Sequence, residues 1–479
     1  MPVRNQNSKA ATVFVYGMFN ILHPGHFRFL NFAASLGNKL TVGVFSDERA
    51  PEATVKQDER LENIKALSFI HDAFILDYPV IEYINEYKPD IVVKGWEYHD
   101  EATPEKEAVE AYGGRLIYSS GEIGLSDFED NGAATGKASI SRQTQFLKRH
   151  DISTQSLQDI LGRFPTLNVC VLGDIIVDNY LNCTAVGMSR EDPTIVVRPA
   201  KSTLYLGGAG IVASHARSLG ASVHFISVTG NDDAGEFSKT QLEQSRVASY
   251  LLQDETRPTT QKTRYRASGK TLLRVNDYSE HAISQALQKQ VTDKLEELLP
   301  ELDVIIFSDF SYGALPQDLI NAISERAAKN EVVLAADSQC SSQIGDIKRF
   351  QNMSLITPTE HEARVSLNNS TDGLIKLSEK VREGTNAENI VITLAEEGLL
   401  MSAVENGNIV NDRLPALQPS AVDPAGAGDA FLVTSSIALA AGANIWQASY
   451  LGSLAAAVQV SRVGNIPIQS SEITAALST

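Results

Sequence analysis

Short apolar runs alternate with helical patterns through the first 120 residues. We expect strands at residues 11–17, 39–45, 72–76, 90–95 and 115–120, and helices at 26–37, 59–70, 80–87 and 104–112. Strands that alternate with helices indicate a parallel sheet covered by helices on both faces. Ligands bind such sheets beyond the carboxyl ends of the strands, so loops that follow strands are the first places to look for chemistry.

The pattern changes after residue 120. Residues 121–150 are rich in Gly, Ser, Asp and Ala, and only the part from about 141 has a helical period. We interpret the segment as an active-site loop followed by a helix that closes a first domain at residues 1–150. Residues 151–165 are expected to be a linker.

A second alternating pattern fills residues 166–479. Strands are expected at 167–174, 222–230, 303–310, 331–338, 353–360 and 389–402, and two long helices begin near 427 and 444. Residues 183–208 and 259–277 resemble antiparallel hairpins and predict a small β lid. The fold class is therefore α/β with two domains: a small doubly wound, Rossmann-like parallel sheet and a larger α/β domain with a lid.

Composition narrows the possible partners. The chain of 479 residues holds 41 Lys and Arg against 59 Asp and Glu, a net charge of −18. Such an acidic chain is a poor partner for nucleic acid or for an anionic membrane surface. The polar N-terminus lacks a signal-peptide core, and no apolar run reaches the roughly 20 residues of a membrane span. We expect a cytoplasmic protein.

The first candidate site follows the first strand, in the segment from Tyr16 to His26. A loop that leaves a strand and enters a helix offers backbone N–H groups to phosphate, and Gly25 allows a close approach. His23 and His26 bracket that glycine, where imidazoles can donate hydrogen bonds to a phosphate during nucleotidyl transfer. The competing interpretation is a helix start with two incidental histidines.

The second candidate site lies near the C-terminus. Gly426, Ala427 and Gly428 open a helix and form an anion hole of small residues, and Asp429 lies in the first helical turn. A carboxylate there can take the proton of a hydroxyl that attacks a γ-phosphate. The competing interpretation is an Asp that only caps the helix. The paired Gly207 and Gly208 ahead of another helix would let a substrate lie against the backbone.

The first segment resembles the nucleotidyltransferase superfamily with the H-x-G-H signature, whose G-x-F-D-x-x-H-x-G-H loop is matched here except that Asn20 replaces Asp. The resemblance covers about residues 11–148. It implies that His23 and His26 are catalytic. It also implies nucleotide or phosphate contacts from the loop and from downstream basic residues, namely Gly17, Phe19, Gly25, Lys56, Lys94 and Arg142.

Residues 167–470 resemble the ribokinase-like (PfkB) family, on the G-G-x-G segment and the D-P-A-G-A-G-D motif. The resemblance implies that Asp429 is the catalytic base, beside the 426–428 anion hole. It implies substrate binding by Asp174, Asp178, Gly207, Gly208 and Arg274, and it makes Glu362 an outer-shell organiser of Mg²⁺.

Both halves resemble the heptose-phosphate kinase/adenylyltransferase family, with the domains in reversed order. Several positions depart from its pattern: Thr359 replaces the Asn of N-x-x-E, Gln339 and Tyr312 stand where the family has Lys, and Pro424-Ala425 replaces the usual pair before G-A-G-D. A different sugar phosphate, or a weakened kinase, is consistent with these changes.

The sequence therefore predicts a transferase with two activities, a sugar-phosphate kinase and a sugar 1-phosphate nucleotidyltransferase, that makes an ADP-heptose type of product. ATP would be the phosphoryl donor, ATP or CTP the nucleotidyl donor, and Mg²⁺ the cofactor. We also expect a homo-oligomer. Two alternatives stay open: a cytidylyltransferase for a polyol or other sugar phosphate fused to the same kinase, and a kinase domain that only binds its ligand.

Overall fold

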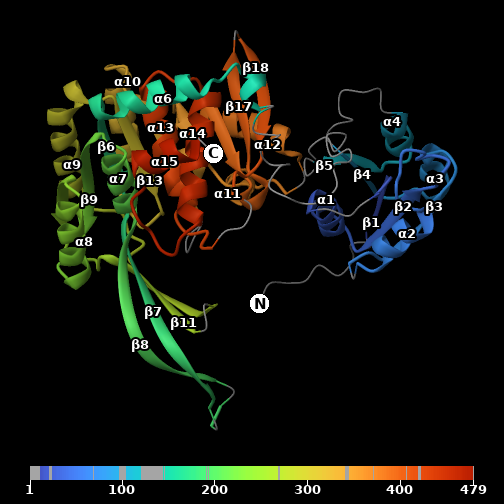
Figure 1. The fold of residues 1–479 in the computed structure, drawn as a ribbon, viewed down its shortest axis with the longest axis horizontal. Helices are drawn as coiled ribbons and strands as arrows, with labels where there is room; N and C mark the ends of the chain where they lie inside the picture. The colour runs from blue at the N-terminus through green and yellow to red at the C-terminus, as the bar shows by residue number, and fades with distance from the viewer. Residues whose placement is uncertain are drawn as a thin grey trace. The chain divides into compact units, whose positions relative to one another are not determined.

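The computed structural model describes residues 11–477 except 21–23, 68, 96–103, 120–143, 145, 190, 193, 268–269, 340–344, 371, 406 and 419–421. The chain divides into two compact units, the first made of residues 1–133 with 369–377 and the second of 134–368 with 378–479. Figure 1 shows both units, and each is described by itself.

The first unit is built on a five-stranded sheet in the order β3-β2-β1-β4-β5, with every pair parallel. Its strands are β1 (Thr12–Gly17), β2 (Lys39–Phe45), β3 (Asp72–Leu76), β4 (Ile91–Gly95) and β5 (Arg115–Ser119). Its helices are α1 (Pro24–Ser35), α2 (Gln57–Lys65), α3 (Val80–Tyr87) and α4 (Pro104–Glu110). The chain order reverses between β1 and β4, and ligands bind such sheets at this switch point.

Alternating burial along β1 explains the two layers of helices. Val13 and Val15 pack into a core with α1 and α2, whereas Phe14 packs with α3 and α4 on the other face. Successive strand residues point to opposite faces, so a continuous apolar run such as this one buries both. The expected doubly wound sheet is confirmed.

The second unit contains a nine-stranded sheet in the order β10-β9-β6-β13-β14-β15-β16-β17-β18, antiparallel only in its last two pairings. The strands are β6 (Asn168–Gly173), β9 (Ser222–Thr229), β10 (Ala248–Gln253), β13 (Val304–Asp309), β14 (Val333–Ser338), β15 (Leu355–Ile356), β16 (Asn389–Thr393), β17 (Leu399–Glu405) and β18 (Asn408–Leu414). The carboxyl ends of the parallel strands carry the acidic residues described below.

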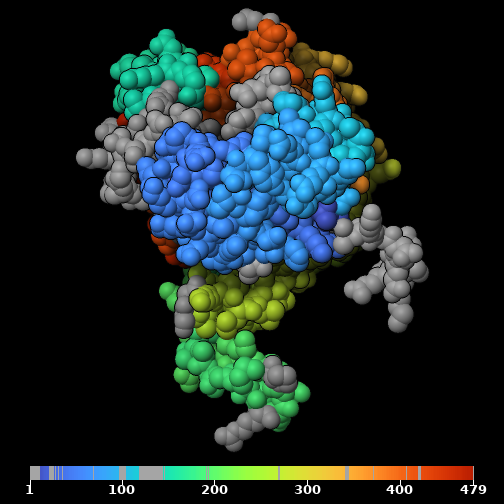
Figure 2. Space-filling view, turned by 90° about the vertical axis from the view of Figure 1, so that its right-hand side faces the viewer, coloured from blue at the N-terminus to red at the C-terminus, as the bar shows by residue number. Residues whose placement is uncertain are grey.

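A separate four-stranded sheet forms the lid, in the order β12-β11-β7-β8. Its strands are β7 (Ile175–Met188), β8 (Ile195–Gly208), β11 (Thr260–Ala267) and β12 (Lys270–Asp277). Figures 1 and 2 show β7 and β8 projecting from the second unit as a long arm. The lid is larger than the sequence indicates, because a single residue, Asp174, separates the end of β6 from the start of β7.

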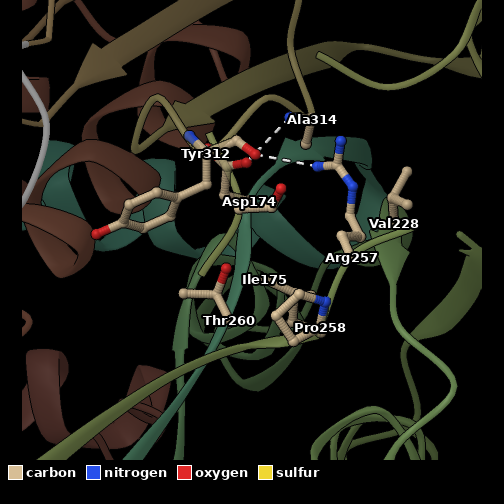
Figure 3. A pocket seen from close by; sticks show the side chains of 9 residues that line it. Asp174, Ile175, Val228, Arg257, Pro258, Thr260, Tyr312 and Ala314 are labelled. Atoms are coloured by element: carbon tan, nitrogen blue, oxygen red, sulfur yellow. Dashed lines mark hydrogen bonds between the residues drawn. The ribbon is translucent and has the colours of Figure 1, made fainter. Parts of the chain in front are cut away.

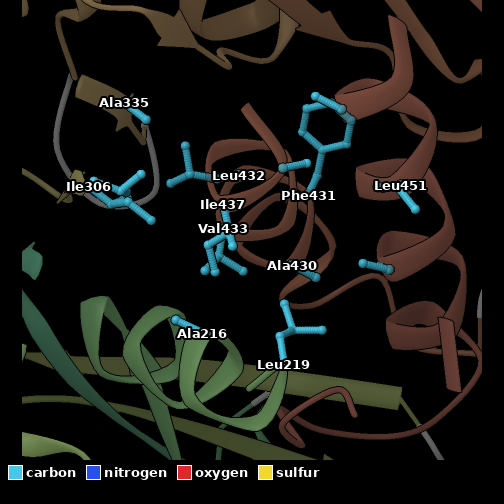
Figure 4. Close-up of a cluster of buried hydrophobic side chains, with 14 of the residues drawn as sticks. Ala216, Leu219, Ile306, Ala335, Ala430, Phe431, Leu432, Val433, Ile437 and Leu451 are labelled. Carbon is cyan, nitrogen blue, oxygen red and sulfur yellow. The ribbon is translucent and has the colours of Figure 1, made fainter. Parts of the chain in front are cut away.

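The core of the second unit gathers around a buried helix, α13 (Ala427–Ala440), whose residues Ala430–Ala438 are all buried. Figure 4 shows Phe431, Leu432 and Val433 of this helix among the side chains of neighbouring elements. The other long helices are α6 (Thr154–Arg163), α7 (Ala209–Ser218), α8 (Asp233–Gln244), α9 (Gln285–Leu298), α10 (Gln317–Ala328), α12 (Leu374–Thr385) and α14 (Ile445–Val460); α11 (Glu360–Ser366) and α15 (Ser470–Leu477) are shorter.

Residues 151–165, for which a linker is expected, include helix α6. Leu157, Ile160 and Leu161 of α6 are buried in the core of the second unit, and Phe146 ahead of the helix is buried in the same core. His150 stacks on Trp446 with ring centroids 4.2 Å apart and hydrogen-bonds Asp412 at 2.6 Å. The segment that includes residues 146–164 is thus part of the second unit.

Several strands differ from their expected bounds. Residues 389–402 form two antiparallel strands, β16 and β17, because the chain reverses at Gly398, whose φ of +92° suits glycine. β10 and β18 have weak apolar patterns and were not expected. In the described part of the chain, helices are all too short or too polar to cross a membrane.

Candidate active sites

The described residues of the loop after β1 pack closely against the end of β1 and the start of α1. Phe19 has a left-handed backbone with φ of 49°, and its buried ring contacts the ring of His26 at a centroid distance of 5.3 Å. The ring also lies against Gly17, where an added Cβ would be 3.3 Å away. Gly25 and His26 lie in the first turn of α1, where backbone N–H groups have no helical partner. Because the Phe19 ring is buried against Gly17 and His26, any nucleotide contact from Phe19 must come from its backbone.

Asn20 ties this loop to the segment before α2. Its side-chain oxygen accepts hydrogen bonds from the backbone N–H groups of Thr54 at 2.8 Å and Val55 at 2.9 Å. Its amide nitrogen donates to Thr54 Oγ1 at 3.0 Å. A carboxylate could accept the two backbone bonds equally well, so Asn20 preserves what an Asp could do here.

Arg60 is a second clamp on the same loop, and its side chain is fully buried. It donates to the carbonyl oxygens of Met18 at 2.6 Å and Val55 at 2.9 Å, and to Asp47 Oδ1 at 2.8 Å. The guanidinium of Arg60 holds the pKa of Asp47 below its ordinary value. The loop after β1 and the segment between β2 and α2 are thus joined by one side chain, which the sequence did not distinguish from surface arginines.

The two lysines expected at this site differ in their surroundings. Lys56 is the residue before α2; its side chain is 87% exposed and lies 3.9 Å from Asp47. Lys94 lies near the end of β4, is largely buried, and pairs with Glu105 at 3.3 Å. His23 and Arg142 lie outside the described residues, as do Trp96–Tyr98 and most of the 121–150 loop.

Replacing Arg60 with Ala should disable the first unit while sparing the second. The change removes the side-chain donor of the Met18 and Val55 carbonyl groups and one donor of Asp47, which keeps its hydrogen bond of 2.9 Å from the Gln57 N–H. A loop displaced by about 1 Å can cost about 10²-fold in rate. Pyrophosphate release and ADP release, measured on the same full-length protein, separate the two units.

The matched control is Lys65→Ala, which removes an exposed cation from the same helix. Nucleotidyl transfer at the wild-type rate in Arg60→Ala would show that the clamp does not position the loop.

In the second unit, the start of α13, where an anion hole is expected, is open at Gly428. Gly426 precedes the helix with φ of +79°, and an added Cβ there would lie 2.5 Å from Asn465 Oδ1. Gly428 is exposed, and a Cβ on it would meet nothing within 4 Å. Backbone N–H groups at this helix end can therefore receive phosphate oxygens.

Asp429 lies in the first turn of α13 and is only 6% exposed. Within the described residues no side chain caps α13, so the interpretation of Asp429 as a helix cap is not supported. Its Oδ1 instead accepts a hydrogen bond of 3.0 Å from the side-chain amide of Gln339, at the end of β14. Burial, with the negative charge of Asp178 next in weight, raises the pKa of Asp429 to about 7.

The raised pKa predicts how phosphoryl transfer depends on pH. Below about pH 7 Asp429 holds a proton and cannot accept another, so kcat/KM for the acceptor should fall about tenfold per pH unit. Above pH 7 the rate should level off. Initial rates at low acceptor concentration between pH 5.5 and 8.5 measure this; a flat profile over that range would contradict the assignment.

Asp178 on β7 points from the lid toward the same helix end. It pairs with Arg264 of β11, and Asn465 donates to its Oδ2 at 3.4 Å. Gly207 on β8 pairs with Ile176, two residues before Asp178, and an added Cβ on Gly207 would be 2.5 Å from Asp178 Oδ2. Glycine at 207 is thus needed to make room for the carboxylate.

Asp174 binds the backbone of a neighbouring loop, residues 310–314. Its carboxylate accepts N–H groups of Phe310 at 2.8 Å, Tyr312 at 3.3 Å and Ala314 at 3.1 Å. Figure 3 shows Asp174 and Arg257 beside Tyr312 and Ala314 of this loop, and Arg257 donates to the Tyr312 carbonyl at 3.0 Å. Burial, and then the charge of Asp309, raise the pKa of Asp174 to about 6.

The residues expected near Mg²⁺ gather beside β14 and α11. Glu362 caps α11, accepting from the backbone and hydroxyl of Thr359, each at 2.8 Å. Asp337 Oδ1 and Thr357 Oγ1 are buried and have no hydrogen-bond partner among the described residues. Burial and the charge of Glu362 raise the pKa of Asp337 well above its ordinary value. Such oxygens can accept hydrogen bonds from the water molecules that a Mg²⁺ ion keeps around it. Among the described residues no cluster of three or more His, Cys, Asp or Glu could hold the ion directly.

Arg274 lies on β12, exposed and directly opposite Arg264 of β11. Directly opposed residues share a face of the sheet, so Arg274 lies on the face that carries Asp178. Lys262, two residues before Arg264, was not predicted and is almost fully buried. The alternating basic positions 262, 264 and 266 were the signal that could have found it.

Two family models match this chain, each over a different part of it. The family model described as "pfkB family carbohydrate kinase" matches residues 166–471, and the model described as "Cytidylyltransferase-like" matches residues 14–155. The order of the two domains is the expected one.

Among curated proteins, "Bifunctional protein HldE" of Helicobacter hepaticus is 32% identical over 64% of this chain and 62% of its own length. The protein of the same name from Nitratiruptor is 30% identical over 62% of each. The matched part of this chain thus spans just under two thirds of these relatives.

Solved structures agree in fold. Phosphofructokinase-2 from Escherichia coli aligns with a TM-score of 0.53 and 16% identity, over 65% of this chain and 99% of its own. Ribokinase from Arabidopsis thaliana aligns with a TM-score of 0.52 and 15% identity, over 65% and 99%. The expected α/β architecture with a lid is confirmed. The chain belongs to the pfkB family of carbohydrate kinases and carries a cytidylyltransferase-like domain ahead of its kinase domain, so it is a transferase.

Proposed function

We propose that this chain is a bifunctional enzyme that phosphorylates a sugar phosphate and joins a sugar 1-phosphate to a nucleoside monophosphate, with release of pyrophosphate. The product would be a nucleotide-activated sugar of the ADP-heptose type. The observation that carries the proposal is the juxtaposition of a buried Asp429 with an open helix N-terminus at Gly428, on a chain that also has a separate nucleotide-binding fold.

For the kinase step, we assign Asp429 as the base. The acceptor hydroxyl gives its proton to Asp429 while its oxygen attacks the γ-phosphorus, and ADP leaves toward the helix N-terminus. Mg²⁺ supplies charge neutralisation on the ATP phosphates when it is bound, and Asp337 and Glu362 would hold its water shell. The 426–428 backbone would receive phosphate oxygens.

For the acceptor, we assign the hydroxyl contacts to Asp178, with the lid face that carries Arg266 and Arg274 turned toward the charged end of the sugar phosphate. Arginine suits phosphate because its planar group offers paired donors. Asp174 acts through the 310–314 loop that it organises, since three backbone N–H groups occupy its carboxylate. We expect the Gly207 and Gly208 backbone to border the same site.

For nucleotidyl transfer, we assign His23 and His26 to the α-phosphate, with Gly17, Gly25 and Lys56 around the phosphates and Lys94 beside the nucleotide. No covalent step is needed, because positioning and charge stabilisation suffice for this chemistry. A second candidate is a cytidylyltransferase for a polyol or other sugar phosphate, which the cytidylyltransferase-like match favours.

A product screen tests the proposal. Purified full-length protein, Mg²⁺, each nucleoside triphosphate and a panel of sugar phosphates are combined, and products are identified by mass spectrometry. We expect a sugar bisphosphate with ATP, and a nucleotide sugar with one triphosphate when a sugar 1-phosphate is supplied. A product with CTP alone would favour the second candidate, and no product from either class would contradict both.

A further inference from the structure

We propose that Lys262, a buried lysine of the lid, is a catalytic residue of the kinase domain whose ammonium group contacts the phosphoryl group while it is transferred. This inference rests on the proposed kinase function and adds a residue to it. In the balanced step the acceptor O–P bond forms, the bond from phosphorus to the ADP oxygen breaks, and the hydroxyl proton moves to Asp429. Lys262 keeps its proton and stabilises the developing negative charge.

The strand register places Lys262 beside the sugar-binding acid. Lys262 on β11 pairs with Asp178 on the parallel strand β7, and neighbouring strands lie about 4.8 Å apart. Asp178 is bonded to Asn465, and Asn465 lies against Gly426 of the anion hole. Lys262 is therefore at the point where the lid approaches the start of α13.

Aromatic rings from the loop after β13 lie against the ammonium group. Lys262 Nζ lies 4.8 Å from the ring centroid of Phe310 and 5.2 Å from that of Tyr312. The side chain is only 4% exposed. Ring faces attract a cation electrostatically, and the attraction is stronger where little water reaches the group.

The charges around Asp429 explain why such a cation is needed. The carboxylates of Asp178 and Glu362 both raise the pKa of Asp429, and Lys262 lowers it. The same negative surroundings would repel an incoming γ-phosphate. The charge of Lys262 acts on Asp429 itself, so Lys262 is placed to offset that repulsion.

The loop at Tyr312 is built to keep Lys262 there. Three backbone N–H groups of residues 310–314 bind Asp174, and Arg257 binds the Tyr312 carbonyl. A charged group that is already held in position stabilises a transition state better than a mobile one, because it needs no rearrangement as the transition state forms.

The test compares Lys262→Met, Lys262→Arg and Lys270→Met. Lys270 is an exposed lysine of the same lid and is the matched control. We expect kcat for ADP release to fall about 10²–10³-fold in Lys262→Met, with little change in KM for ATP. A loss of this size is typical when one hydrogen-bond donor to a transition state is removed. Lys262→Arg should retain part of the activity. The rise of kcat/KM with pH should also shift to higher pH in Lys262→Met, which loss of packing alone would not cause.

A chemical rescue covers the case in which Lys262→Met destabilises the lid. Lys262→Cys treated with 2-bromoethylamine regains an ammonium group at this position, and alkylated wild type controls for the native cysteines. Recovery of turnover supports the proposal. Unchanged kcat in Lys262→Met, or no recovery after alkylation, overturns it. If wild type itself releases no ADP with any sugar phosphate while nucleotidyl transfer proceeds, the proposed kinase function fails and this inference fails with it.

Discussion

Asp429→Asn should lose phosphoryl transfer by about 10²–10⁴-fold, the usual contribution of a general base. The asparagine has the same shape and can keep the contact with Gln339, but it cannot accept the proton of the acceptor hydroxyl. ATP affinity should change little, because the helix N-terminus and Mg²⁺ hold the phosphates. Steady-state ADP release and nucleotide binding measure the two effects separately.

A measurement of stability distinguishes loss of the general base in Asp429→Asn from damage to the fold. The pKa of Asp429 is raised to about 7 from an ordinary 3.8, so its ionised form is disfavoured in the folded protein. As pH rises through this window, ionisation of Asp429 destabilises the fold, and Asp429→Asn removes that cost. At pH 8 the variant should have a Tm equal to or above that of wild type. Asp318→Asn, on the exposed side of α10, is the matched control. Turnover equal to wild type would rule out Asp429 as the base.

A fragment of residues 166–479 should fail to fold stably, whereas residues 134–479 should fold. The shorter fragment begins where the kinase family match begins, but it lacks Phe146, Leu157, Ile160 and Phe164, which are buried in the second unit. Each such side chain contributes about 1.5–3 kcal/mol on burial. Their combined loss approaches the whole stability of a typical domain, about 5–15 kcal/mol.

Urea unfolding of the two fragments, followed by circular dichroism, measures this difference. The full-length variant Leu157→Ala is a smaller version of the same change and should lower the stability of the second unit by about 2–5 kcal/mol. Equal unfolding midpoints for the two fragments would show that residues 134–165 do not belong to the kinase core.

The order and type of the main elements could be predicted because their periodicities are strong. The apolar runs that became β1, β6 and β13 are buried on both faces, and a run of this kind is typical of a parallel strand. The lid and the segment at 151–165 were less predictable. β7 follows β6 almost without a break, and only tertiary contacts show that α6 packs into the second unit.

The candidate sites could be predicted where a local motif carries the chemistry, as at Gly426–Asp429. Their supporting residues come from distant segments. Gln339 and Asn465 lie 90 and 287 residues from their partners Asp429 and Asp178. Arg60 has the sequence surroundings of an ordinary surface arginine, and only the fold buries it. Asp174 matched a sugar-ligand position, but its carboxylate is bonded to backbone groups that no motif reveals.

The central claim is that one chain carries two independent transfer sites. The most direct measurement is a pair of assays on wild type, His26→Ala and Asp429→Asn, each full length, that quantify pyrophosphate with nucleotide sugar and ADP with sugar bisphosphate. We predict that His26→Ala loses only the first activity and Asp429→Asn only the second. Loss of both activities in either variant, or of neither in both, would contradict the account.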